Sequence, residues 1–96
     1  MTIDKFKTIA KNANAAIYLN NVYMLDHVCN DNGEESFVIR GRRIRGHYEE
    51  DIDVIRYDEI KSVKRSRKTK EYVILSYNKE RDEYWEISIN LLTVKW

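Results

Sequence analysis

The chain has 96 residues, of which 43% are hydrophobic and 34% are charged, and its net charge is +1. This composition is typical of a folded protein and excludes a disordered chain. A dedicated nucleic-acid binder usually carries a clear excess of positive charge, so the near-neutral total weighs against that class. We expect one domain, residues 1–96, with a single modest core.

The cysteine content and the apolar runs weigh against disulfide-linked, zinc-binding and membrane-spanning proteins. Cys29 is the only cysteine, so neither an intramolecular disulfide nor a cysteine-rich zinc site is expected. No run approaches the roughly 18 apolar residues of a membrane span, and Lys5, Lys7 and Lys11 interrupt the apolar positions near the N-terminus. We therefore expect a cytoplasmic protein without a membrane contact. The absence of proline and the abundance of Ile, Asn, Lys and Tyr are typical of AT-rich genes, such as those of phages and mobile elements.

Residues 2–14 form the first predicted element, an amphipathic helix. Apolar side chains recur there at intervals of three and four residues, which places them on one helical face. Thr2 suits the N-cap position and Asp4 suits the first turn, where negative charge is favourable. The apolar face consists of Ile3, Phe6, Ile9, Ala10 and Ala13.

Residues 15–29, AAIYLNNVYMLDHVC, are compatible with two structures. Their apolar positions could extend the helix, but the β-branched and aromatic residues favour a strand that is broken by a turn or bulge at Asn20–Asn21. We therefore predict strand. The following residues, 30–35 (NDNGEE), predict a tight turn, because Asn, Asp and Gly tolerate left-handed backbone conformations.

The rest of the chain has a β pattern. The predicted strands are 36–48, 52–60, 71–78 and 84–95, and polar links of hairpin length join them. Some of these strands have apolar residues on both faces, and one helix covers only part of one face. The predicted fold is therefore α+β, with an N-terminal helix followed by a four- to five-stranded antiparallel meander, folded into a strongly bent sheet or a small barrel. This element order resembles the SH3-like and Sm-like small barrels, and YDEIKSV (57–63) is similar to a segment of pleckstrin-homology-like domains.

The stretch FVIRGRRIRGHY (37–48) places four arginines and a histidine in a predicted strand. A bulge at Gly41 would bring Ile44 onto the core face. Pairing across an acidic turn would then set Arg45 opposite Ile55 and Arg43 opposite Tyr57. Arginine and tyrosine beside apolar residues are enriched in the centres of protein interfaces. The candidate protein-binding surface therefore consists of Arg40, Arg43, Arg45, His47, Ile55 and Tyr57.

A second basic cluster lies in the predicted link 62–70. For both clusters, a solvated or salt-bridged face is the alternative to a binding site, because runs of charge are usually of this kind. The second cluster is the candidate nucleic-acid-binding site, and it consists of Lys64, Arg65, Arg67, Lys68 and Lys70.

The sequence lacks catalytic and metal-binding motifs. His27 and Cys29 project to the same side of a strand, but no distant ligand accompanies them, so a core cysteine beside a histidine is favoured over a metal or thiol site. Phosphate loops, nucleophile elbows and zinc or calcium signatures are missing, and we predict no cofactor, metal or catalytic residue. A metal-independent ribonuclease, with His47 as acid or base and arginines at the phosphate, is the enzyme alternative.

These patterns favour a small non-enzymatic module that binds a macromolecule. We expect a protein partner, such as a nucleic-acid-processing protein that is controlled by an inhibitor or accessory factor of phage or mobile-element type. Direct binding of RNA or single-stranded DNA through the two basic clusters is the alternative, and self-association is compatible with the sequence.

Overall fold

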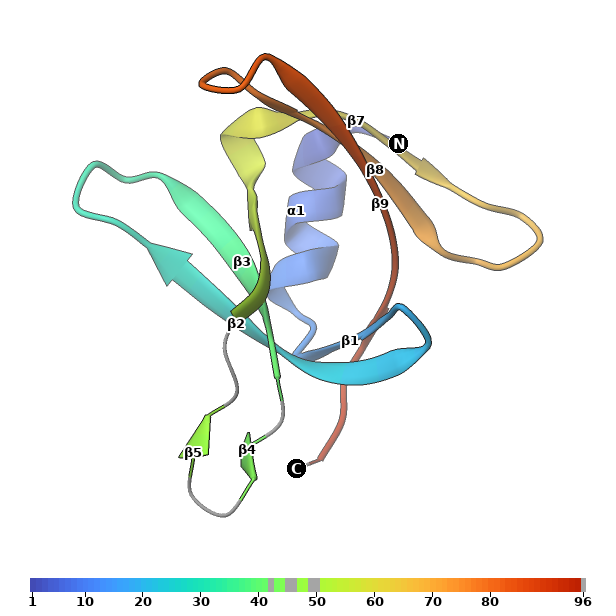
Figure 1. Cartoon of the computed structure of the whole chain (residues 1–96). Coiled ribbons are helices and arrows are strands. Elements are labelled where there is room, and N and C mark those ends of the chain that lie inside the picture. Colours follow the sequence, from blue (N-terminus) through green and yellow to red (C-terminus); the bar gives the residue numbers. More distant parts are fainter. Residues whose placement is uncertain (42, 45–46, 49–50, 96) are drawn as a thin grey trace.

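The computed structural model of the chain describes residues 1–41, 43–44, 47–48 and 51–95. One helix lies against the concave side of a curved antiparallel sheet (Figure 1). In chain order the elements are α1 (Ile3–Lys11), β1 (Ala15–Tyr18), β2 (Asn21–Cys29), β3 (Glu35–Arg40), β4 (Arg43–Ile44), β5 (His47–Tyr48), β6 (Asp51–Arg56), the 3-10 helix η1 (Tyr57–Glu59), β7 (Ile60–Arg65), β8 (Tyr72–Asn78) and β9 (Glu83–Leu92).

The helix α1 confirms the first prediction. Thr2 is the N-cap, and its hydroxyl oxygen accepts a hydrogen bond of 3.1 Å from the backbone N–H of Lys5. Phe6 and Ala10 are fully buried, so the predicted apolar face is the face that meets the sheet. The helix ends at Lys11, three residues before the predicted limit.

Residues 15–29 form strands, as predicted. The β1–β2 hairpin turns at Leu19 and Asn20, whose φ angles are 51° and 63°. A two-residue turn with positive φ at both positions matches the twist of the flanking strands. In the next connection, between β2 and β3, Gly33 has a φ of 79°, in agreement with the turn predicted for residues 30–35.

The seven-stranded sheet has the order β6-β3-β2-β1-β9-β8-β7, while β4 and β5 form a separate two-stranded hairpin. Its edge strands β6 and β7 are consecutive in the chain and are joined by η1 alone, so the two edges lie close together and the sheet bends strongly. Among the described strands no ladder joins β6 to β7, so the sheet does not close into a barrel. The α+β class is confirmed, whereas the predicted strand number is too small and the pairing of β1 with β9 departs from a simple meander.

The strand β7 falls within residues that the sequence placed partly in a link. A register shift between Ile60 and Ser62 in the β7–β8 ladder explains this difference. It brings Ile60 and Val63 to the core although they are three positions apart, and both are buried. The segment YDEIKSV therefore spans η1 and the first part of β7.

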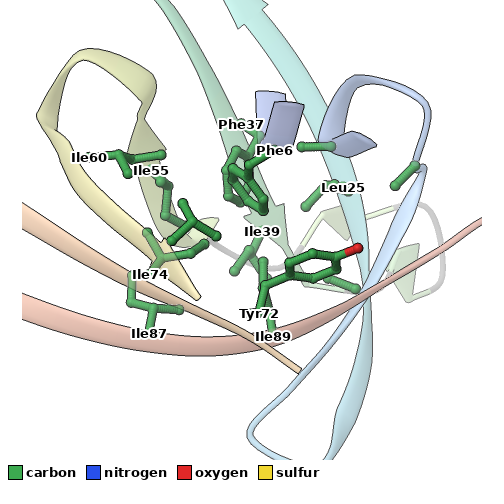
Figure 2. Packing of buried hydrophobic residues seen from close by; sticks show 14 of the residues in the cluster. Phe6, Leu25, Phe37, Ile39, Ile55, Ile60, Tyr72, Ile74, Ile87 and Ile89 are labelled. Atoms are coloured by element: carbon green, nitrogen blue, oxygen red, sulfur yellow. The ribbon is translucent and has the colours of Figure 1, made fainter. Parts of the chain in front are cut away.

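One hydrophobic core fills the space between α1 and the bent sheet (Figure 2). Phe6 lies at its centre, with its ring centroid 6.1 Å from that of Phe37 and 5.5 Å from that of Tyr72. The largest fully buried side chains come from the helix and both halves of the sheet, so the core joins these elements. They are Phe6, Phe37, Ile39, Ile55, Ile74 and Ile89.

Candidate functional site

The predicted arginine surface does not form as expected. Ile55 pairs with Phe37 and is 1% exposed, and Tyr57 is 7% exposed, so both belong to the core. Their predicted place on an outer face beside arginines is therefore wrong. The physical reason is the register: β6 pairs with β3 only as far as Arg40, and the residues that follow turn back in their own β4–β5 hairpin.

The remaining residues of that surface are separated from the two core residues. Arg40 is half-buried, and its guanidinium lies 3.4 Å from the carboxylate of Asp26. Arg43 is in β4, opposite Tyr48, and His47 is in β5. Arg45 lies outside the described residues. The binding role of these four residues and the ribonuclease alternative stay predictions.

The second basic cluster is brought together by one hairpin. Lys64 and Arg65 end β7, and the other three lysines and arginines of the cluster lie in the turn that leads to β8. All five side chains are exposed. The Arg65 guanidinium lies over the Tyr72 ring, 5.2 Å from its centroid. Among the described residues, none of the five forms an ion pair, in contrast to Lys7, Lys11, Arg40 and Arg56.

The two free edges of the sheet differ in chemistry. On β7, exposed Lys61, Lys64 and Arg65 protect the edge, because charged side chains disfavour pairing with another strand. On β6, Ile52 and Val54 are 39% and 48% exposed. The β6 edge therefore has an apolar surface of the kind that natural edges usually avoid.

A groove of about 370 Å³ runs along the β6 edge. Ile52 and Val54 line one side, and Ser76 and Trp85 line the other. Trp85 alternates with the buried Ile87, so it projects toward the concave side of the sheet, but it lies beyond the core and is 40% exposed. Its indole N–H donates to the Glu83 carboxylate at 3.3 Å.

The backbone of β6 has hydrogen-bonding groups that point into this groove. The N–H of Val54 donates to the carboxylate of the preceding Asp53 at 3.0 Å, so it does not contribute to the ladder with β3. Successive residues of a strand direct their backbone groups to opposite sides. Those of Asp53 and Ile55 therefore face β3, whereas those of Val54 face the free edge. Within the described chain, the edge has no strand beyond it.

Negative charge accumulates at one end of β6. The guanidinium of Arg56 lies 2.6 Å from the Glu34 carboxylate, 3.4 Å from that of Asp58 and 3.6 Å from that of Glu59. Three carboxylates therefore surround one guanidinium at this end of the groove, and Lys61 and Lys79 line the adjoining pocket.

A second group of polar side chains connects α1 to the sheet, and sequence reasoning missed it. The Lys11 and Lys7 ammonium groups each lie 2.8 Å from the same Glu35 carboxylate oxygen, and they lower the pKa of Glu35 to about 2. Lys7 also lies over the Tyr57 ring, 5.4 Å from its centroid. Burial, and then the charge of Glu35, raise the pKa of Tyr57 to about 12. These residues are distant in sequence, so no local pattern indicates the group.

The described part of the chain contains neither a candidate metal site nor a helix that could span a membrane. There, no cluster of three or more His, Cys, Asp or Glu side chains is arranged to hold a metal ion. The described helices are too short or too polar to cross a bilayer. In comparisons with protein-family models, curated proteins and solved structures, no match to this chain was found.

Proposed function

We propose that the chain is a non-enzymatic protein-binding module that accepts an extended segment of its partner as an additional strand at the β6 edge. The contrast between the two sheet edges is the observation that supports this function. Lysine and arginine protect β7, whereas β6 exposes Ile52 and Val54 on an edge that has no neighbouring strand within the described chain and whose Val54 N–H bonds the Asp53 carboxylate. Strand addition supplies main-chain hydrogen bonds for affinity and side-chain pockets for specificity.

The groove defines the chemistry of the segment that it would accept. Side chains of an added strand alternate between the two faces. Those on the concave side would contact Trp85, and those on the outer side would contact Ile52 and Val54, so apolar residues are favoured at both kinds of position. A lysine or arginine is favoured at the end near Arg56, where carboxylates are in excess.

A displayed library of extended peptides, each with apolar residues and a terminal lysine or arginine, tests this function. We expect selected peptides to shift the amide resonances of β6 and to protect the Val54 amide from exchange. Val54→Lys places a charge at the edge and should weaken binding about tenfold or more. Val28→Lys is the matched control, because Val28 is also an exposed valine (39%) but lies on β2. Equal binding by both variants would exclude the β6 site.

Direct nucleic-acid binding by the β7–β8 hairpin is the second candidate. Six lysines and arginines occur within residues 61–70 without an acidic residue, and the five predicted site residues form no ion pair within the described chain. A replacement of Arg67, Lys68 and Lys70 by glutamine should flatten the salt dependence of oligonucleotide binding by about two units. The opposite turn supplies the control, Lys79→Gln with Arg81→Gln. Absence of oligonucleotide binding at low salt would exclude this candidate.

A further inference from the structure

The convex face formed by β7, β8 and β9 is open to solvent and carries aromatic side chains. The helix α1 packs on the opposite, concave face, where Ile74 and Ile87 are buried (Figure 1). Side chains alternate along a strand, so residues an odd number of positions away from these two project outward. On β9 the outward residues include Tyr84, which is 64% exposed, and Glu86, which is also exposed. On β8 they include the half-buried Tyr77.

Tyr77 and Tyr84 form a pair of rings on this face. They are direct partners in the β8–β9 ladder, and their ring centroids are 4.8 Å apart at an interplanar angle of 38°. The Tyr77 hydroxyl donates a hydrogen bond to the Asp82 carboxylate, which holds the Tyr77 ring in place. Tyr84 therefore packs on a fixed neighbour while most of its own surface is open. A flat aromatic group can stack on it.

Positive charge lies on the β7 side of this ring pair. The Lys61 ammonium lies over the Tyr77 ring, 5.7 Å from its centroid. Lys64 pairs with Val73, which also projects outward, so Lys64 belongs to the same face. Both lysines are exposed, and they continue into the basic turn between β7 and β8. That turn adds three exposed cations, Arg67, Lys68 and Lys70.

Negative charge lies on the other side of the ring pair. Glu86 projects outward from β9, where it pairs with Leu75. An anionic chain on this face is therefore attracted toward β7 and repelled from β9. Strands β7 and β9 each lie about 4.8 Å from β8, so a lysine side chain of β7 can reach the phosphate of a nucleotide whose base lies on Tyr84.

We infer that this convex face is a stacking platform for single-stranded nucleic acid. An unpaired base stacks on the Tyr84 ring, and phosphates of the same strand contact Lys61, Lys64 and the basic turn. Proteins that bind single strands without sequence preference combine these two kinds of contact, aromatic rings for the bases and cations for the backbone. The inference rests on the proposed binding of nucleic acid by the β7–β8 hairpin, and it adds the recognition of unpaired bases.

Two probes of equal charge separate base stacking from electrostatic attraction. They are a labelled thymidine oligonucleotide of about ten nucleotides and an abasic strand of the same length. Fluorescence anisotropy at low salt measures their binding to the intact chain. We expect the thymidine probe to bind about tenfold more tightly, which equals about 1.4 kcal/mol and is the order of one stacked base. Equal affinity for the two probes would overturn the inference but not the hairpin contact, whereas absence of binding by both probes would exclude both.

Variants then assign the stacking to Tyr84. Tyr84→Leu removes the ring at an exposed position, so it should lower the affinity for the thymidine probe about tenfold and leave the affinity for the abasic probe unchanged. Lys64→Gln should weaken the binding of both probes alike, because it removes a phosphate contact. Tyr23→Leu is the matched control, since Tyr23 also belongs to a ring pair, with its centroid 6.5 Å from that of Tyr18, but packs against the core. If Tyr84→Leu binds the thymidine probe as tightly as Tyr23→Leu does, the inference fails.

Discussion

The N–H of Val54 donates to the carboxylate of Asp53 at 3.0 Å, and this bond occupies a donor on the free edge of β6. The same local bond occurs on β2, where the N–H of His27 donates to the Asp26 carboxylate at 2.9 Å. Both bonds are found where a strand has no neighbour on that side, since β1 pairs with β2 only as far as Met24. An aspartate side chain can thus accept a hydrogen bond from the unpaired N–H of the next residue. It then competes for that N–H with the carbonyl groups of an incoming strand.

Asp53→Ala should make the β6 edge more able to pair with other chains. The substitution frees the Val54 N–H, removes a negative charge from the groove lining and removes the bond from the Tyr18 hydroxyl. We expect self-association to increase with protein concentration in sedimentation velocity measurements, and strand-forming peptides to bind more tightly. The free energy of unfolding should fall by about 1–3 kcal/mol, because the bonds from the Val54 N–H and from the Tyr18 hydroxyl are both lost.

Asp26→Ala is the control for this experiment. Each aspartate bonds the next N–H and also has one distant partner, which is Arg40 for Asp26 and the Tyr18 hydroxyl for Asp53. The two substitutions therefore remove similar interactions, but only Asp53 lies in the β6 groove. Equal self-association of both variants would show that Asp53 does not protect the edge.

Glu35→Gln should reduce stability in a pH-dependent manner. Ion pairs with Lys11 and Lys7 lower the pKa of Glu35 from 4.5 to about 2 in the folded chain. The stability that the charged carboxylate contributes is fully present above pH 4.5 and is lost as the pH falls toward about 2. Hydrogen bonding to Glu35 raises the pKa of Lys7 above 10.5, so that contribution is present below pH 10.5 and is lost at higher pH.

Thermal unfolding across the pH range measures this effect. The difference in melting temperature between the original chain and Glu35→Gln should be largest between pH 4.5 and 10.5 and should shrink on either side. Glu86→Gln is the control, because Glu86 is exposed and has no ion pair within the described chain. A constant difference from neutral pH to pH 2 would contradict the role of the two lysines.

Local sequence patterns predicted the elements that depend on local physics. The three- and four-residue spacing of Phe6 and Ala10 fixes the buried face of α1, and Thr2 fixes its start. The turn at Leu19 and Asn20 lies one residue before the predicted position, Asn20–Asn21, and Asn20 is the residue there that tolerates positive φ. These features require no knowledge of distant contacts.

Local patterns could not predict which side chains of β6 and β7 are buried and which are exposed. The placement of Ile55 depended on a strand register, and a shift at Ile39–Arg40 together with the separate β4–β5 hairpin changed every expected partner. The burial of Val63 could not be predicted, because Val63 lies in a basic run and an irregularity after Ile60 breaks the two-residue alternation of β7. Trp85 shares a face with Ile87 by strand alternation, but only the structure shows that this face extends beyond the core.

The β1–β2 turn contains a residue poorly suited to its conformation. Leu19 has a φ of 51° and is 67% exposed, so it gains little from packing to offset the cost of a left-handed backbone. Leu19→Asn should stabilise the chain by about 0.5–1 kcal/mol, because Asn adopts this conformation more readily. Leu19→Val should have the opposite effect, since a β-branched residue tolerates positive φ least. Chemical denaturation of both variants tests the sign, and a lower stability of Leu19→Asn would contradict this account.

Asn14 extends the sheet beyond the end of β9 with its side chain. Its amide nitrogen donates to the carbonyl oxygen of Val94 at 2.6 Å, and its amide oxygen accepts from the N–H of Val94 at 2.7 Å. The Asn14 backbone bonds on both sides as well, to Leu92 and to Leu25. One side chain thus imitates a strand partner for a residue that has left the ladder.

Asn14→Ala should therefore loosen the segment after β9. The loss of both bonds leaves two backbone groups of Val94 without partners in a partly buried site, which should cost about 1–3 kcal/mol. Hydrogen exchange of the Val94 amide should accelerate more than that of the β8–β9 ladder. Asn12→Ala is the matched control, because the Asn12 side chain makes only an exposed bond of 2.9 Å to the Thr8 carbonyl oxygen, and its loss should change stability by less than about 0.5 kcal/mol. Unchanged exchange at Val94 in Asn14→Ala would show that Asn14 does not hold this segment.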